Sequence, residues 1–194
     1  MSITFYQWSR EFKKTGKTYF HFSELQKLYP SEKESLKVLL SRWSKQGLIE
    51  RLGRGYYAFE LSAVDYLQFS QELIEPSYLS FEYALFYHHL LEQIPSTVTL
   101  ATVKRGQTIP VGNWTFEYSH LKQALFFGFE MQKDIYVATR EKALCDLLYL
   151  MSRGIRSADL TGLEAKSFQR KRLVKMFASF PPSVKVMARS LHLV

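Results

Sequence analysis

The stretch SRWSKQGLIERLGRGYYAF, Ser41–Phe59, decides how the N-terminal part of the chain folds. It begins inside a helical pattern whose apolar residues recur at i, i+3, i+4 and i+7, which predicts one buried face. Gly47 is typical of a helix C-terminus. Two short apolar runs then flank Gly53-Arg54-Gly55, so the sequence predicts a hairpin directly after the helix.

Two further helices are predicted upstream of this stretch. Phe5, Trp8 and Phe12 have helical spacing, and a second helix is expected between a cap at Ser23 and Pro30. The helix that leads into the quoted stretch is expected to begin near Ser31. Three helices, a short strand and a hairpin make a winged helix-turn-helix, predicted for residues 1–70. Its expected core is Phe5, Trp8, Phe12, Leu25, Leu28, Leu36, Leu39, Leu40, Trp43 and Tyr57.

In a winged helix the third helix enters a DNA major groove and the hairpin lies along the backbone. The face opposite the apolar stripe of that helix would be turned to the groove, with Lys37 and Arg42 on its flanks. It carries Glu34, Val38, Ser41 and Lys45. Arg51 and Arg54 fall on the hairpin, where they would meet phosphate or the minor groove. The open alternative is a protein-docking module, because winged helices serve that purpose too.

The chain has 194 residues and a formal net charge of +8, which is unevenly distributed. Residues 1–60 carry 11 Lys/Arg against 6 Asp/Glu, residues 61–152 carry 6 against 10, and residues 153–194 carry 9 against 2. Two basic ends favour a polyanionic partner, with nucleic acid ahead of a membrane surface. The alternative is that the lysines only keep the protein soluble and bind no specific partner.

The second part of the chain, residues 71–194, reads as a mixed α/β domain with a small sheet and a helical tail, so the expected fold class is α+β. Ser80 is expected to cap a long helix, FEYALFYHHLLEQ, and strands are expected at STVTLAT, TFEYSHL, LFFGFEM and IYVAT. Thr139 is expected to cap REKALCDLLYLMSRG, which Gly154 closes. A basic helix is expected over residues 163–180.

One side of that last helix is predicted to carry a second surface for DNA or for a protein partner, formed by Lys166, Arg170, Lys171 and Lys175. The alternatives are an acidic toxin, an RNA, or a solvated helix face that packs on the acidic middle of the chain.

The sequence holds no positive signal for an enzyme, a metal or a cofactor. His88, His89 and Glu92 lack the spacing of a zinc helix, and no phosphate-binding glycine loop or nucleophile motif is present. Cys145, the single cysteine, is expected to be a small buried apolar residue. No apolar run reaches the roughly 18 residues of a membrane span, and the N-terminus does not read as a secretory signal. The expected location is therefore the cytoplasm.

Several segments resemble a known family. EPSYLSFEYALFYHHLLEQIPSTVTLAT (Glu75–Thr102), LFFGFE (Leu125–Glu130) and IYVATREKALCDLLYL (Ile135–Leu150) resemble the C-terminal domain of AbiEi-type antitoxins, which are transcriptional regulators of type IV toxin–antitoxin and abortive-infection systems. LLSRWSKQGLIERLGRGYYAF resembles the winged helix of the same family. The resemblance runs from about Phe20 to Leu150, and the tail beyond Gly154 matches only in being helical and basic.

The resemblance implies an autorepressor that binds repeats upstream of its own operon and counteracts a nucleotidyltransferase-like toxin, with or without touching it. The family's DNA-reading positions correspond here to Ser35, Lys37, Val38, Ser41, Arg42, Lys45, Arg51 and Arg54. Two rival functions stay open. One is a plain transcription factor whose C-terminal domain senses a ligand or oligomerises, and the other is an enzyme such as a nuclease with dispersed acidic residues.

Overall fold

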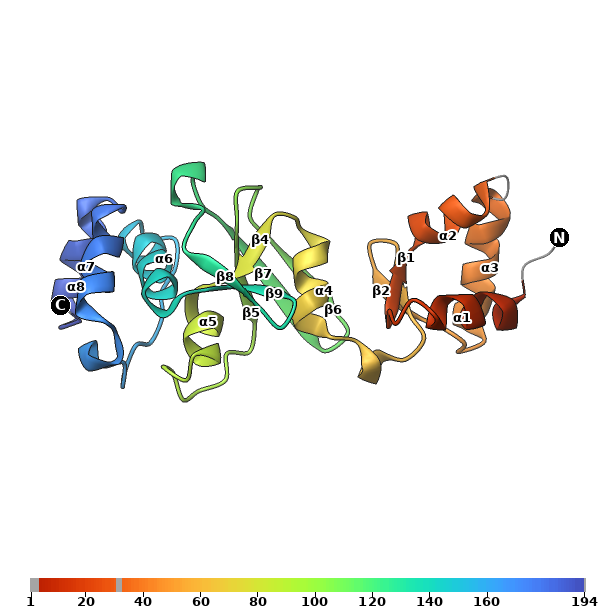
Figure 1. The fold of residues 1–194 in the computed structure, drawn as a ribbon, viewed down its shortest axis with the longest axis horizontal. Coiled ribbons are helices and arrows are strands. Elements are labelled where there is room, and N and C mark those ends of the chain that lie inside the picture. The colour runs from red at the N-terminus through yellow and green to blue at the C-terminus, as the bar shows by residue number, and fades with distance from the viewer. Residues whose placement is uncertain (1–3, 31–32, 194) are drawn as a thin grey trace. The chain divides into compact units, whose positions relative to one another are not determined.

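The computed structural model describes residues 4–30 and 33–193, and the chain divides into two compact units, Met1–Tyr66 and Leu67–Val194 (Figure 1). We call them unit 1 and unit 2. The described residues form eight α-helices and two β-sheets, which confirms the α+β class. The expected boundary after residue 70 falls inside helix α4 (Tyr66–Leu73).

Unit 1 has three helices and a three-stranded antiparallel sheet of order β1-β3-β2. In chain order its elements are α1 (Phe5–Lys13), β1 (Tyr19–His21), α2 (Phe22–Leu28), α3 (Lys33–Lys45), β2 (Glu50–Gly53) and β3 (Tyr56–Ala58). α3 ends as the sequence predicts. Gly47 is left-handed with φ 69°, and its neighbour Leu48 donates its N–H to the Trp43 carbonyl at 2.9 Å.

The core of unit 1 is aromatic and aliphatic. Its buried members are Trp8, Phe12, Phe20, Leu25, Leu36, Leu40, Trp43 and Ile49. Leu28 was expected in this core, but it lies at the last turn of α2 and is 60% exposed. The cap of α2 is His21 and not Ser23, so that helix begins two residues earlier than predicted, at Phe22. The predicted start of α3 at Ser31 lies outside the described residues.

Unit 2 is built on a six-stranded mixed sheet of order β6-β7-β5-β4-β9-β8. β4 pairs antiparallel with β5 and parallel with β9, and β5 pairs parallel with β7. The strands are β4 (Ser77–Leu79), β5 (Val98–Thr102), β6 (Gln107–Val111), β7 (Trp114–His120), β8 (Phe129–Gln132) and β9 (Ile135–Ala138). The helices after α4 are α5 (Phe81–Tyr87), α6 (Arg140–Ser152), α7 (Arg170–Ala178) and α8 (Pro182–Ser190).

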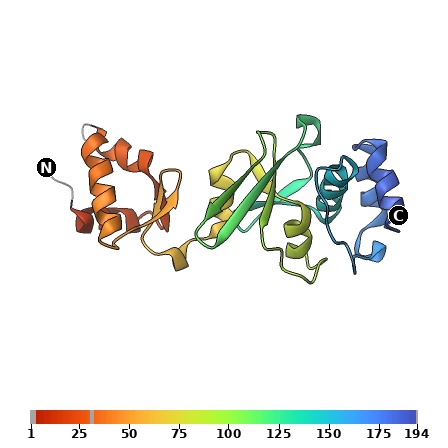
Figure 2. The same ribbon diagram turned by 180° about the vertical axis from the view of Figure 1, so that it is seen from behind.

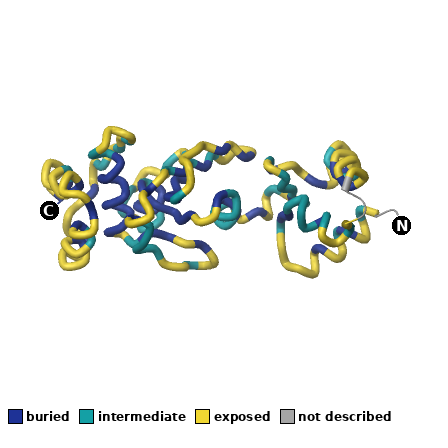
Figure 3. Tube along the Cα trace, turned by 90° about the horizontal axis from the view of Figure 1, so that it is seen from above, coloured by how far each residue is buried: buried dark blue, intermediate teal, exposed yellow. Residues whose placement is uncertain are grey.

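Helix α6 is the centre of unit 2. It packs against α5, α7, α8 and β9, and Figure 2 shows it between the sheet and the α7–α8 pair. Every residue from Glu141 to Leu150 is buried. In Figure 3 α6 is buried along nearly its whole length, whereas α7 and α8 are mostly exposed. Both ends of α6 are as predicted. The Thr139 hydroxyl accepts the Lys142 N–H at the start of the helix, and Gly154, after its end, is left-handed with φ 66°.

Three expected elements of unit 2 are shorter than the sequence pattern indicates. α5 stops at Tyr87, because His89 adopts the left-handed region with φ 58° and Leu90 donates its N–H to the Leu85 carbonyl at 2.9 Å, which closes the helix. The strand expected over LFFGFEM begins only at Phe129, after a short 3₁₀ turn.

The third is the tail helix, which begins at Arg170 and not near residue 163. The Glu141 carboxylate of α6 accepts the backbone N–H of Gln169 at 3.1 Å, and this contact fixes the extended entry to α7. The start of this helix is therefore set by the Glu141 side chain, which lies 28 residues upstream of Gln169.

Candidate functional site

The outward face of α3 presents all six of its expected DNA-reading side chains to solvent. These exposed residues are Ser35, Lys37, Val38, Ser41, Arg42 and Lys45. The opposite side of the helix is buried through Leu36, Leu40 and Trp43, and the Trp43 ring meets the Phe5 ring edge-on at 5.3 Å. Because the buried side is locked into the core, the orientation of the exposed face is fixed.

An acidic residue shares this face. The Glu34 carboxylate accepts a hydrogen bond from the Lys37 Nζ at 3.0 Å, and both side chains are more than half exposed. The ammonium of Lys37 is therefore partly neutralised by its own helix. The i, i+3 spacing of the two residues would have predicted this pair from sequence.

The hairpin turn between β2 and β3 presents Arg54, and Arg51 lies exposed on β2. Gly53, Arg54 and Gly55 are all left-handed, with φ values of 97°, 51° and 86°. A run of this kind requires glycine at most of its positions, because a Cβ atom is strained there. The turn therefore holds the single non-glycine residue, Arg54, at its tip.

His21 fixes this turn, and sequence reasoning missed it. Its Nδ1 accepts the Ser23 N–H at 3.2 Å, so the ring proton belongs on Nε2, which donates to the Arg54 carbonyl at 3.2 Å. The ring also lies 4.7 Å from the Tyr56 ring. The signal in the sequence was the capping box HFSE, in which Glu24 accepts the His21 N–H at 3.1 Å.

The four cations expected to share one helix face in the tail do not lie on one helix. Lys166 belongs to a separate 3₁₀ turn and pairs with Glu164 at 2.6 Å. Arg170, Lys171 and Lys175 lie on α7, where all three are exposed. The basic character of this end is extended by further exposed cations that the sequence reasoning left out, namely Arg172, Lys185 and Arg189.

A charged cluster is buried inside unit 2. Lys142 and Asp146 form an ion pair one turn apart on α6, and both side chains are 0% exposed. The Asp146 carboxylate also accepts hydrogen bonds from the Tyr78 hydroxyl at 2.9 Å and the Ser80 hydroxyl at 2.8 Å. The Lys142 ammonium donates to the Tyr78 oxygen at 2.8 Å. Burial lowers the pKa of Lys142 and raises the pKa of Asp146, while each partner opposes the shift of the other.

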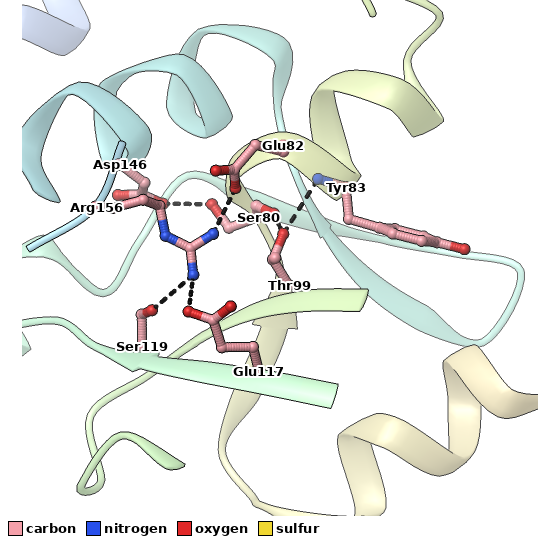
Figure 4. A network of polar contacts seen from close by, with 8 residues as sticks. All are labelled: Ser80, Glu82, Tyr83, Thr99, Glu117, Ser119, Asp146 and Arg156. Atoms are coloured by element: carbon pink, nitrogen blue, oxygen red, sulfur yellow. Dashed lines mark hydrogen bonds and ion pairs between the residues drawn. The ribbon is translucent and has the colours of Figure 1, made fainter. Parts of the chain in front are cut away.

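The Lys142–Asp146 cluster ties α6 to the start of α5, and Figure 4 shows Ser80 reaching Asp146. Ser80 is the N-cap residue of α5, as predicted, but its hydroxyl donates to Asp146 and makes no capping hydrogen bond. The ammonium of Lys142 is fully buried between Asp146 and the Tyr78 hydroxyl.

A second network lies beside a cleft of about 820 Å³. Arg156 donates to Glu82 at 2.6 Å, forms an ion pair with Glu117, and donates to the Ser119 hydroxyl at 3.3 Å (Figure 4). Its guanidinium also lies 5.0 Å from the centre of the Phe81 ring. With two carboxylates on one guanidinium, the charge of Arg156 is compensated within the protein, so this arginine is poorly suited to hold an anion.

The described residues hold no group of three or more His, Cys, Asp or Glu side chains placed to bind a metal ion. His88 donates one hydrogen bond to the Ala138 carbonyl at 2.7 Å, and His89 is exposed. Cys145 is buried, as expected, and its burial raises the pKa of the thiol. Within the described part of the chain, no helix has the length and apolar character needed to cross a membrane.

A scan against protein-family models finds no match for the chain, and a search of curated proteins finds none either.

Proposed function

We propose that unit 1 is a winged helix that reads double-stranded DNA with α3 and contacts the backbone with the β2–β3 hairpin. The observation that carries this proposal is the exposed polar face of α3, opposite a side that is locked into the core. A helix of 13 residues is about 20 Å long and fits a major groove about 12 Å wide. Ser41 and Lys45 would reach base edges from this face.

The hairpin supplies the second part of the interface. Arg51 and Arg54 are exposed, and the turn that carries Arg54 is anchored by His21. Arginines on such a turn would contact phosphates or a narrow minor groove, and they would add affinity without reading sequence directly. A division of labour follows, in which α3 provides specificity and the hairpin provides positioning.

In the cell, we propose that the protein is an autorepressor and the antitoxin of a type IV toxin–antitoxin system. This role is supported by the resemblance of Glu75–Thr102, Leu125–Glu130 and Ile135–Leu150 to AbiEi-type antitoxins. The partners are operator repeats of its own operon and a nucleotidyltransferase-like toxin, and the place of action is the cytoplasm. The exposed cations of α7 are a candidate second surface for DNA or for the toxin.

The alternative is a winged-helix transcription factor whose C-terminal unit senses a small ligand. The cleft of unit 2 beside Arg156 favours this alternative. The two functions are separated by testing whether the protein protects cells that express a toxin gene encoded beside it. A ligand-sensing transcription factor would not rescue such cells.

The test of DNA binding measures fluorescence anisotropy of the DNA upstream of the gene and of a random duplex of equal length. Ser41→Ala/Lys45→Ala should lose discrimination between the two by about tenfold or more. Arg51→Ala/Arg54→Ala should weaken both and reduce the salt slope by about one for each phosphate that is no longer neutralised. Lys13→Ala, an exposed cation on α1, is the matched control. Wild-type operator affinity in both double variants would overturn the proposal.

The role of the tail is tested with Arg170→Gln/Lys171→Gln/Lys175→Gln. Weaker operator binding with a smaller salt slope assigns the α7 surface to DNA. Unchanged operator binding together with a failure to protect against the toxin assigns it to the antitoxic function. If both properties stay at wild-type values, this surface has neither role.

A further inference from the structure

Val38 is an exposed aliphatic residue on a helix face that is otherwise polar. It is 61% exposed, whereas Leu36 and Leu40 of the same helix are buried in the core of unit 1. The positions four residues before and after it on α3 are held by Glu34 and Arg42, and both are exposed. Val38 therefore belongs to the outward face of α3 and not to its core side.

The place of Val38 on this face is central. Ser41 and Lys45 follow it on the same side of the helix, and Lys37 and Arg42 flank it. An isolated exposed aliphatic residue is ordinary on a protein surface. On a face that enters a DNA groove, however, Val38 would lose water together with its polar neighbours. Its contribution to affinity then depends on the group that it covers.

The major groove offers an aliphatic side chain one favourable contact. Base edges display hydrogen-bond donors and acceptors there, and the 5-methyl group of thymine is the apolar exception. A side chain such as valine that covers a donor or an acceptor removes its water and returns no hydrogen bond, which weakens binding. Against a methyl group the same side chain buries apolar surface, which is worth about fourfold in affinity for one methyl group.

We propose that Val38 is a specificity-determining residue that reads the 5-methyl group of a thymine. This inference rests on the proposed DNA-binding function of α3, and it names the base that the apolar residue of that face selects. Ser41 and Lys45 would select bases by hydrogen bonds, whereas Val38 selects by apolar contact. The two kinds of readout can be separated, because the methyl group can be removed from the DNA without changing base pairing.

The test measures fluorescence anisotropy of the duplex upstream of the gene, synthesised once with thymine and once with uracil in place of every thymine. Wild-type protein should bind the uracil duplex about fourfold or more weakly. In Val38→Ser this ratio should shrink by about fourfold, because the serine side chain offers no apolar surface to the methyl group. Serine and valine have similar helix propensities, so α3 should stay intact.

A matched control is available in unit 2. Val186 on α8 is 64% exposed, and Val186→Ser makes the same chemical change outside the proposed interface. This variant should keep the wild-type ratio between the thymine and uracil duplexes. Because Val38 and Val186 are both exposed, neither substitution opens a core, and the urea midpoints of both variants should stay close to that of the wild type.

Replacing thymines one at a time locates the contact. The rise from Val38 to Ser41 along α3 is about 4.5 Å, little more than the roughly 3.4 Å between neighbouring base pairs. The thymine whose replacement weakens binding should therefore lie within about two base pairs of the position at which Ser41→Ala relaxes specificity. A sensitive thymine far from that position would contradict the contact with Val38.

Failure of this inference differs from failure of the proposed function. Specific operator binding with equal affinity for the thymine and uracil duplexes would refute the inference and leave DNA binding by α3 in place. If such a protein gains affinity from 5-methylcytosine, the methyl group is read on cytosine, and thymine is again the wrong base. Equal losses on the uracil duplex in wild type, Val38→Ser and Val186→Ser would mean that uracil acts through the shape of the duplex, which also refutes the contact. Absence of operator binding by the wild type would refute the proposed function and this inference together.

Discussion

Replacing Asp146 with asparagine removes the charge that compensates a fully buried lysine. The Asp146 carboxylate pairs with Lys142 and accepts hydrogen bonds from the Tyr78 and Ser80 hydroxyls. Asparagine keeps the shape and one oxygen acceptor for those hydroxyls. Its amide cannot balance the ammonium of Lys142, whose side chain is 0% exposed.

The size of the effect follows from what Lys142 retains. Removing one partner of a buried ion pair costs about 3–5 kcal/mol. Lys142 keeps the Tyr78 oxygen at 2.8 Å and lies 5.3 and 5.2 Å from the Phe127 and Phe180 ring centres, contacts that favour its charged form. We therefore expect the lower end, about 3 kcal/mol, which is a large share of the roughly 5–15 kcal/mol that stabilises a typical domain.

The pH dependence has a definite sign. Burial lowers the pKa of Lys142, and removing Asp146 lowers it further. Between that lowered pKa and the usual value of 10.5, the unfolded chain binds a proton that the folded chain has released. The free energy of unfolding of Asp146→Asn therefore rises with pH across this window. The difference between its free energy of unfolding and that of the wild type shrinks towards pH 10.

Two probes follow the two units separately during urea unfolding. Trp8 and Trp43 are buried in unit 1, while Trp114 of unit 2 is 37% exposed, so tryptophan fluorescence mainly follows unit 1. Cys145, the single cysteine, lies buried on α6 and reports unit 2 through its reaction with a thiol reagent. The Cys145 midpoint should fall by about 1–2 M urea, since m is roughly 2 kcal/mol per molar.

The double variant Lys142→Met/Asp146→Asn separates the effect of charge compensation from the effect of packing. Methionine removes the buried charge, and asparagine still accepts from the hydroxyls, so the double variant should be more stable than Asp146→Asn alone. The reasoning fails if Asp146→Asn costs less than about 1 kcal/mol, or if the two substitutions destabilise additively. Glu130→Gln, an exposed carboxylate of the same unit, is the neutral control.

Three further predictions concern single residues. His21→Ala removes the hydrogen bond to the Arg54 carbonyl and should weaken operator binding about threefold to tenfold in anisotropy titrations. Its circular dichroism spectrum should be unchanged. Wild-type affinity would exclude a positioning role for His21. Glu34→Gln frees Lys37 from its ion pair and should tighten binding to random DNA at low salt, and weaker binding would contradict this. Cys145 should not react with a thiol reagent at pH 8 until the chain unfolds, and rapid labelling of the folded protein would contradict its burial. Because burial raises the pKa of this thiol, the folded chain keeps a proton that the unfolded chain loses. The free energy of unfolding should therefore decline as the pH rises above about 9.

The features that the sequence predicts correctly are local ones. Gly47 and Gly154 end their helices and Thr139 begins α6, because capping depends on residues within one turn. The exposed face of α3 follows from the helical period of its apolar residues. Arg54 could be placed at a turn tip because the glycines on either side permit left-handed backbone.

The features that the sequence does not predict depend on distant contacts. The Lys142–Asp146 pair is buried because other helices cover α6. The late start of α7 depends on Glu141, and the anchor of the Arg54 turn is His21, which lies 33 residues upstream. The cleft beside Arg156 draws its lining from several separate segments, so no local pattern marks it.

The placement of buried polar side chains allows DNA binding to be separated from folding. Among the described residues, the buried serine, threonine, glutamate, aspartate and lysine side chains all belong to unit 2. The core of unit 1 is apolar, so its stability depends on hydrophobic burial, which moderate concentrations of NaCl change little. The phosphate contacts that we propose for the exposed cations of α3 and the hairpin would weaken steeply over the same range. A titration from about 50 to 300 mM NaCl should therefore reduce operator affinity while the tryptophan unfolding midpoint stays nearly constant. If the two fall together, the weaker binding reflects unfolding of unit 1, and the salt slope no longer counts phosphate contacts.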